Sequence, residues 1–315
     1  MGNTDATGVF IMDEFLSIHA PFFARFIDYS GLWIVEPFSA NQILQSLSSL
    51  DLKAHVDHGA EPLKSALEKI PTAGAGSKAI AMVRLTGLLM KSQSSMGGTS
   101  TIQARRDIRQ AAADPDVGAI LLAIDSPGGT VAGTDDLAAE IRAARAAKPV
   151  WAHIEDLGAS AAYWAASQAS RITANSPTAL AGSIGTVQRI EDNSAANEKD
   201  GRRTLTFATG PLKAIGGGSK VTDEQAAHIQ SLVESVQGSF DAAVKKGRNL
   251  SSEQLQAVRH GGVMTATKAM DAGLIDGIQP LGKTLAEMAR EIKSSGAARS
   301  QAMNDIGVLP MLVRG

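Results

Sequence analysis

Short apolar runs alternate with longer segments of helical spacing over most of the chain. The run 117–125 is apolar up to its final aspartate, which predicts a strand buried on both faces. Further strands are expected at 79–85, 150–154, 171–174 and 204–207, and helices at 100–113, 134–147, 222–246, 251–260 and 265–272. Strands that alternate with helices in this way favour the α/β class, a sheet crossed by helices.

The first seventy residues carry a different pattern. Apolar clusters lie at 22–27 and 32–35, and the segments 41–50 and 62–70 have helical spacing. We expect this region to be a helical lead-in that packs on the main domain or on a neighbouring subunit. The small residues that follow have linker composition. The expected organisation is a lead-in at 1–71, a linker at 72–78, a main domain at 79–284 and a partly mobile tail at 285–315, helical to about residue 293.

Composition and charge exclude several classes of protein. The 315 residues are 44% hydrophobic and 20% charged, as in ordinary globular proteins. A net charge of −2 gives no reason to expect nucleic acid or an anionic membrane as a partner. The absence of cysteine excludes disulfides, cysteine nucleophiles and thiolate metal sites. No apolar run approaches the length of a membrane span, and Asp13 and Glu14 interrupt the first apolar run. We therefore expect a soluble cytoplasmic protein without a membrane anchor.

Ser160 is the first candidate for a catalytic side chain. It follows the predicted strand and a Gly158-Ala159 turn, and an alanine-rich segment of high helix propensity comes after it. A serine at such a turn can expose its side chain. Its own N–H and that of Ala161 would lie at a helix N-terminus, where negative charge is favoured. This suits an acyl-transfer nucleophile with an oxyanion donor beside it, although Ser160 could also be a simple N-cap.

A second candidate is the segment Asp-Ser-Pro-Gly-Gly at 125–129, at the carboxyl end of the most buried strand. Ligands of α/β sheets bind outside such strand ends. Paired glycines let the backbone approach a ligand and present its N–H groups to an oxyanion or a phosphate. A plain strand-to-helix turn is the alternative. The segment lacks the glycine patterns of dinucleotide and phosphate-binding loops, so nucleotide binding is unsupported.

A serine nucleophile needs a base. Among the six histidines, His153 lies on the strand before Ser160, and the others fall in the lead-in or on predicted helices. A desolvated lysine is the other choice. Lys213 has small and apolar neighbours over 208–218, and Lys220 is its nearest competitor.

Taken together, three segments resemble a known family. Asp-Ser-Pro-Gly-Gly at 125–129, Gly-Ala-Ser-Ala-Ala-Tyr at 158–163 and Ala-Gly-Ser-Ile-Gly-Thr-Val at 181–187 are similar to motifs of the serine/lysine peptidases of the signal-peptide-peptidase A type, peptidase family S49. That family includes phage head-maturation proteases. The resemblance extends over residues 79–278 and implies a ClpP/crotonase-like β/β/α spiral.

The resemblance also implies roles for particular residues. Ser160 would be the nucleophile, and Lys213, 53 residues further on, the general base. Gly128 or Gly129 would form the oxyanion hole with the N–H of Ala161. The substrate cleft would be lined by Gly182, Ser183, Ile184 and Gly185, with Ser183 as a hydrogen-bond partner of Lys213. Thr186 stands where the family usually has valine.

The implied activity is peptide-bond hydrolysis by a Ser/Lys dyad, without metal or cofactor. The expected partners are polypeptides (a capsid scaffold, a portal, the chain's own tail or signal-peptide-like segments) and further copies of the chain in a homo-oligomer. The missing anchor favours a phage protease in the host cytoplasm or within the prohead over a soluble bacterial peptidase. Two other classes stay open. One is a non-catalytic capsid component, and the other is a crotonase-type acyl-CoA enzyme that would not need Ser160 with Lys213.

Overall fold

The computed structural model describes residues 33–35, 65–73, 77–93, 97–190, 192–216 and 219–307. The strands are β1 Trp33–Val35, β2 Leu67–Ile70, β3 Ala79–Met90, β4 Thr99–Ser100, β5 Val117–Thr130, β6 Val150–Ala159, β7 Arg171–Ala174, β8 Leu180–Gly182, β9 Val263–Thr265 and β10 Gly277–Ile278. The helices are α4 Thr101–Ala113, α5 Thr134–Ala144, α6 Ala161–Ala166, α7 Ser194–Lys199, the short 3₁₀ helix η1 Pro211–Ala214, α8 Asp223–Arg248, α9 Ser252–Val258, α10 Ala266–Asp271 and α11 Leu281–Gly307.

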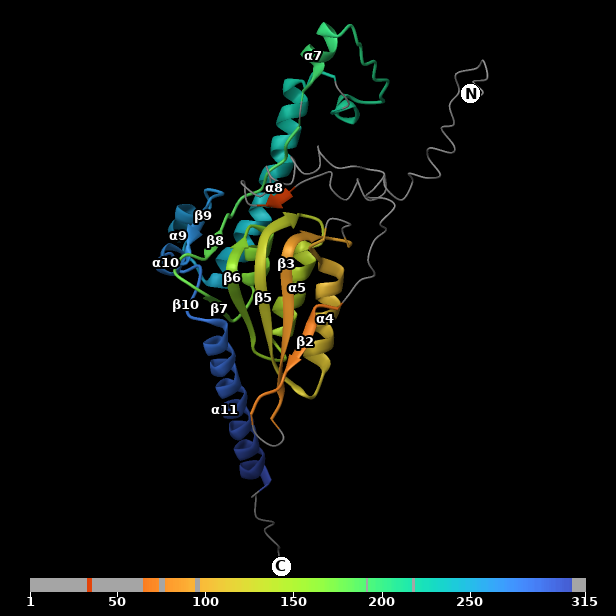
Figure 1. Cartoon of the computed structure of the whole chain (residues 1–315). Coiled ribbons are helices and arrows are strands. Elements are labelled where there is room, and N and C mark those ends of the chain that lie inside the picture. The colour runs from red at the N-terminus through yellow and green to blue at the C-terminus, as the bar shows by residue number, and fades with distance from the viewer. Residues whose placement is uncertain are drawn as a thin grey trace, which may run out of the picture.

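A central sheet with helices on both faces organises the fold, which confirms the α/β class (Figure 1). Its main path runs β10-β7-β6-β5-β3-β2. Side chains of β3 and β5 alternate between two cores. Residues such as Leu85, Leu122 and Ile124 pack under α4, α5, α6 and α8, and Leu121 packs on the opposite face with Met288 of α11. Residues 117–124 are thus covered on both faces, as predicted.

The three longest strands each pair with two sets of neighbours. The first parts of β3, β5 and β6 pair in parallel in the main sheet, and the register shifts between Thr86 and Leu88 of β3 and between Ile124 and Ser126 of β5. Beyond the shifts, the strand ends pair with the short strands β4, β1 and β8 respectively. The helices α4, α5 and α6 follow in turn. Each of β3, β5 and β6 is thus followed along the chain by a helix, which agrees with the expected ClpP/crotonase-like β/β/α fold.

Most of the predicted elements are confirmed, with small changes at their ends. The Ser100 hydroxyl caps α4 by accepting from the N–H of Gln103, and Thr222 with Gln225 forms a capping box on α8. The helix predicted at 134–147 ends at Ala144. The tail helix α11 begins at Leu281 and runs to Gly307, beyond the predicted end near 293.

Two predicted elements are wrong. The spacing at 62–70 predicted a helix, but residues 67–70 form β2, which pairs antiparallel with β3 and exposes Glu68 and Lys69. Charged side chains suit such an edge strand, and four residues are too few to separate the two periodicities. The segment 204–207 is not a strand and has no sheet neighbour within the described residues. The predictions for 22–27 and 41–50, most of the lead-in, the middle of the linker and the last eight residues lie outside the described part of the chain.

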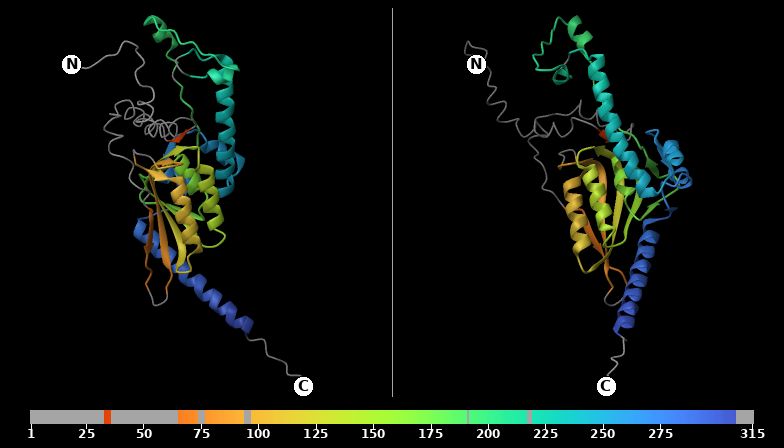
Figure 2. Two further views of the ribbon diagram at one scale, coloured as in Figure 1. Left: turned by 90° about the vertical axis from the view of Figure 1, so that its right-hand side faces the viewer. Right: turned by 180° about the vertical axis from the view of Figure 1, so that it is seen from behind.

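Residues 187–222, here called the arm, stand away from the sheet together with the first half of α8 (Figures 1 and 2). The arm contains α7 and η1 and connects β8 to α8. Its large apolar side chains Leu205 and Phe207 are 62% and 94% exposed. None of the described helices is long and apolar enough to span a membrane.

Candidate active site

Ser160 lies between the end of β6 and the start of α6, as the sequence predicted. Its φ of 56° is unusual for a residue other than glycine. Two backbone hydrogen bonds hold it there: its N–H donates to the Gly182 carbonyl at 2.8 Å, and its own carbonyl accepts from the N–H of Trp164 at 2.8 Å. A strained backbone of this kind persists only where its surroundings enforce it, and such positions cluster at functional sites.

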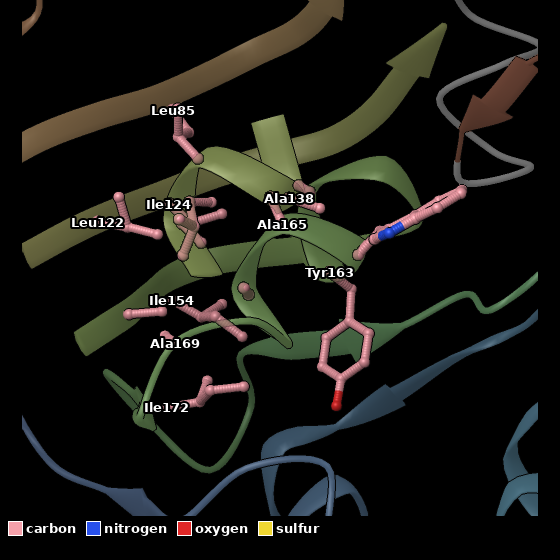
Figure 3. Close-up of a cluster of buried hydrophobic side chains, with 14 of the residues drawn as sticks. Leu85, Leu122, Ile124, Ala138, Ile154, Tyr163, Ala165, Ala169 and Ile172 are labelled. Atoms are coloured by element: carbon pink, nitrogen blue, oxygen red, sulfur yellow. The ribbon is translucent and has the colours of Figure 1, made fainter. Parts of the chain in front are cut away.

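The helix after Ser160 provides that enforcement, because all six residues of α6 are buried. The Tyr163 hydroxyl donates to the Leu274 carbonyl at 2.8 Å, and the Trp164 ring stacks on Phe240 of α8 at 4.8 Å between centroids. Burial raises the pKa of the Tyr163 phenol, so it remains a neutral donor. The small side chain of Ala165 lets α6 approach Ala138 of α5 (Figure 3).

The Ser160 side chain itself is buried, contrary to the predicted exposure. Its exposed fraction is 0%, and within the described part of the chain its Oγ has no hydrogen-bond partner. The N–H of Ser160 is occupied by Gly182 and cannot serve as an oxyanion donor. The N–H of Ala161, in the first helical turn, has no acceptor among the described residues. The backbone N–H of Ala161 is therefore free to act as the oxyanion donor expected from the sequence.

The segment 125–129 lies inside β5 rather than after it, which corrects the interpretation as a strand end or turn. Ser126 pairs with Gly158, so the glycines come next to the Ser160 turn. The Ser126 hydroxyl donates to the Gly87 carbonyl at 2.6 Å and accepts from the N–H of Gly128 at 3.2 Å.

The two glycines of this segment are required for different reasons. Gly128 has a φ of 105°, which side-chain-bearing residues rarely adopt. At Gly129, a Cβ atom would lie 1.8 Å from the Leu89 carbonyl oxygen of β3. Backbone without side chains is therefore built into β5 beside Ser160.

The predicted cleft residues Gly182 to Gly185 also lie beside Ser160, because Gly182 pairs with Ala159 of β6. Ser183 has a φ of 53°, and its N–H donates to the Gly262 carbonyl at 2.8 Å. Its hydroxyl donates to the Gly261 carbonyl at 2.9 Å, not to Lys213 as expected. Ile184 is buried, and a Cβ at Gly185 would meet Gly261 at 2.9 Å. Sequence reasoning missed this supporting turn, although the glycine pair at 261–262 was its signal.

The structure does not bring Lys213 to Ser160. Lys213 lies on η1 in the arm, its side chain is exposed, and its N–H donates to the Gly210 carbonyl at 3.1 Å. The sheltered surroundings suggested by its small and apolar neighbours are absent. Its competitor Lys220 is exposed too. Neither candidate lysine is therefore among the residues that surround Ser160.

His153, the alternative base, lies on the other side of the sheet from α6. Its neighbours Ala152 and Ile154 pack in the α6 core, so alternation along β6 turns His153 towards α11. There its Nδ1 lies 2.8 Å from the Thr173 hydroxyl and 3.3 Å from that of Thr284. Burial lowers the pKa of the His153 imidazole to about 4. His153 is a neutral core residue and does not reach Ser160.

Comparison with known proteins agrees with the segments around Ser160. Residues 142–295 match the model of peptidase family S49. The chain belongs to that family. It is 36% identical over 204 residues to capsid assembly protease C of Escherichia phage lambda, covering 62% of this chain and 46% of that protein. It is 31% identical over 215 residues to Protease 4 of Salmonella typhi, covering 68% of this chain and 35% of that protein.

The chain therefore spans about a third to a half of the length of these two relatives. Among solved structures, it is similar to an enoyl-CoA hydrotase/isomerase family protein from Silicibacter pomeroyi, with a TM-score of 0.43 and 13% identity over 72% of this chain and 82% of that one.

Proposed function

We propose that this S49 family member is a serine endopeptidase with Ser160 as the nucleophile and Lys213 as the general base. The strained Ser160 at the start of a fully buried helix is the observation that carries the proposal. A nucleophile must stand out from its backbone at a fixed point beside oxyanion donors. The N–H of Ala161 and the glycine backbone of β5 flank this serine on two sides.

The proposed reaction follows from these roles. Neutral Lys213 takes the proton of the Ser160 hydroxyl while Oγ attacks the carbonyl carbon of a peptide bond. The negative charge on the former carbonyl oxygen is stabilised by the N–H of Ala161 together with that of Gly129, because the N–H of Gly128 already donates to the Ser126 hydroxyl. The lysine ammonium then protonates the departing amine, which leaves an ester on Ser160. Water hydrolyses this ester and regenerates the serine.

Lys213 must move relative to Ser160 or come from another copy of the chain. The arm that carries it also exposes Leu205 and Phe207, so packing of the arm would bury apolar surface and the lysine together. A lysine becomes a base only when it is desolvated. We therefore infer a homo-oligomer in which contacts of the arm complete the dyad.

The similarity to capsid assembly protease C supports a phage setting. We infer that the substrates are polypeptides of prohead assembly, namely scaffold, portal or the chain itself, and that cleavage takes place in the host cytoplasm or within the prohead. The similarity to Protease 4 supports a second candidate, a bacterial peptidase for signal-peptide-like segments. Both settings use the same chemistry at Ser160.

Intact-mass analysis over time tests the proposed chemistry. The wild-type chain, Ser160→Ala, Lys213→Ala and the matched control Lys220→Ala are incubated alone and with an unfolded test protein. We expect cleavage by the wild type and by Lys220→Ala, and a loss of at least about 10³-fold in both other variants. Cleavage that survives Ser160→Ala would contradict the proposal. No cleavage by the wild type would favour a structural role, and acyl-CoA turnover that survives Ser160→Ala would favour a crotonase-type enzyme.

A further inference from the structure

The edge of β5 next to Ser160 is shared by two different strands. β3 pairs with β5 from Val117 to Gly129 and so takes one edge along almost the whole strand. β6 takes the other edge, and its last pair with β5 is Gly158 with Ser126. Beyond that pair, β1 lies antiparallel on β5, with Trp33 opposite Thr130, Ile34 opposite Gly129 and Val35 opposite Gly128. Since β3 occupies the first edge, β1 continues the edge that β6 has left.

This placement puts β1 at the level of the nucleophile. Ser160 stands two residues past Gly158, and Gly128, the partner of Val35, stands two residues past Ser126. At that level β6 has turned away from β5, because the N–H of Ser160 bonds to Gly182 on the β8 side. β1 appears as the short red arrow at the ends of β5 and β6 in Figure 1. It fills the strip of β5 formed by Gly128, Gly129 and Thr130.

A peptide substrate needs the same strip. If the N–H of Gly129 is to hold the scissile carbonyl, the substrate backbone must lie along β5 between that glycine and Ser160. Extended peptides bind exposed sheet edges through main-chain hydrogen bonds. Glycines allow this approach from close range. Trp-Ile-Val is an aromatic and β-branched sequence of high strand propensity, well suited to lie there.

We propose that Trp33–Val35 is an internal competitor for the peptide-binding strip of β5, and that an extended apolar peptide replaces it when substrate binds. The buried state of Ser160 fits this occupied arrangement, because a scissile carbonyl cannot reach a nucleophile with an exposed fraction of 0%. The inference rests on the proposed function, since it assigns the ligand of the same site. A purely structural β1 would instead stay paired during turnover.

A disulfide lock separates the two cases. The chain has no cysteine, so Trp33→Cys with Thr130→Cys creates a single defined pair between directly opposed residues. The kcat/KM for an external peptide is measured with the oxidised and the reduced protein. We expect at least a tenfold lower value after oxidation and recovery after reduction to the level of Thr130→Cys alone. An oxidised protein that cleaves as fast as the reduced one would overturn the proposal.

Proline substitutions release the strand in the opposite direction. Adjacent residues of a strand direct their N–H groups to opposite sides, so either Ile34→Pro or Val35→Pro removes an N–H that faces β5. Whichever of the two variants removes that N–H should lower the KM for an external peptide several-fold, whereas Asn41→Pro, outside β1, should not. A synthetic peptide of residues 28–40 should inhibit it competitively. Unchanged KM values in both proline variants would contradict the proposal.

Hydrogen–deuterium exchange keeps this test independent of catalysis. In the Ser160→Ala background, the amides of 128–131 should exchange faster when β1 carries the effective proline, and slow again when the peptide of residues 28–40 is added. This result would support the internal competitor even if no cleavage is found and the proposed function fails. If neither Ile34→Pro nor Val35→Pro changes the exchange of these amides, the proposal is overturned.

Discussion

The Ser160 turn and the Lys213 arm are held in opposite ways. Every residue of α6 is buried, and the turn before it is tied to β8 by a backbone hydrogen bond. The arm is exposed over 201–209, and among its described residues none after Val187 pairs with a strand. Figure 3 shows the first region inside the core, and Figure 1 shows the second standing away from it. Packing within one chain therefore fixes the position of Ser160 but not that of Lys213.

This difference separates two sources of structural information. Buried contacts place Ser160 without any partner, because α6 has only one way to pack between α5, α8 and the sheet. The arm carries large apolar side chains, Leu205 and Phe207, that are exposed in the described part of the chain. Substitutions in the two regions should accordingly differ in what they disturb: stability in the first and association in the second.

The largest expected effect on stability is in the α6 core. Trp164 is 1% exposed and stacks on Phe240, so Trp164→Ala removes a large buried ring next to the Ser160 turn. We expect a loss of about 3–5 kcal/mol in the free energy of unfolding. Urea unfolding at fixed protein concentration measures it. The control Trp164→Phe keeps an aromatic ring and should lose less than half as much; a loss below about 1 kcal/mol in Trp164→Ala would show that α6 is not enforced by packing.

The next effect is a pH dependence of stability that arises from a buried histidine of the core. The pKa of His153 is about 4 in the folded chain and ~6.5 when unfolded, because burial disfavours the imidazolium. Between these values the unfolded state binds a proton that the folded state does not, so stability falls as the pH drops from about 6.5 to about 4. The full loss is on the order of 3 kcal/mol.

Urea unfolding between pH 4 and 7 measures this slope in the wild type and in His153→Gln. The glutamine should remove the histidine's share of the slope, while His228→Gln on α8, a matched exchange elsewhere, should leave it in place. Carboxylates also titrate at the acid end, but their share is common to all three proteins. Equal slopes in the wild type and His153→Gln would contradict the assignment of a buried neutral histidine.

The features that were predicted correctly are local in sequence, and those that were missed depend on contacts between distant segments. The strand before Ser160, the turn and the alanine-rich helix are local features, and all three are present. β1 and β2 escaped prediction because their partners, Gly128–Thr130 and Ile80–Val83, lie far away in sequence. The alternating polar and apolar residues at 204–207 predicted a strand, yet no neighbour pairs with it among the described residues.

The candidate site divides in the same way. Ser160, the β5 glycines and Gly182–Gly185 come together because consecutive β/β/α units set them at one edge of the sheet. The exposure of Ser160 was mispredicted, since burial of a side chain depends on long-range packing that local spacing does not show. The place of Lys213 depends on contacts of the arm that no local pattern encodes.

The smallest effect on stability, and the sharpest comparison, comes from the same exchange at two phenylalanines. Phe207 on the arm is 94% exposed, whereas Phe240 of α8 is fully buried against Trp164. Phe207→Ser should change the free energy of unfolding of the monomer by no more than about 0.5 kcal/mol, and Phe240→Ser should cost at least about 3 kcal/mol. If the arm completes the dyad by association, Phe207→Ser should also weaken the oligomer in light-scattering measurements and lower cleavage by about tenfold or more, with the fold intact. An arm variant that associates and cleaves like the wild type would contradict this role of Phe207, because burial of its side chain would then not be needed to bring Lys213 to Ser160.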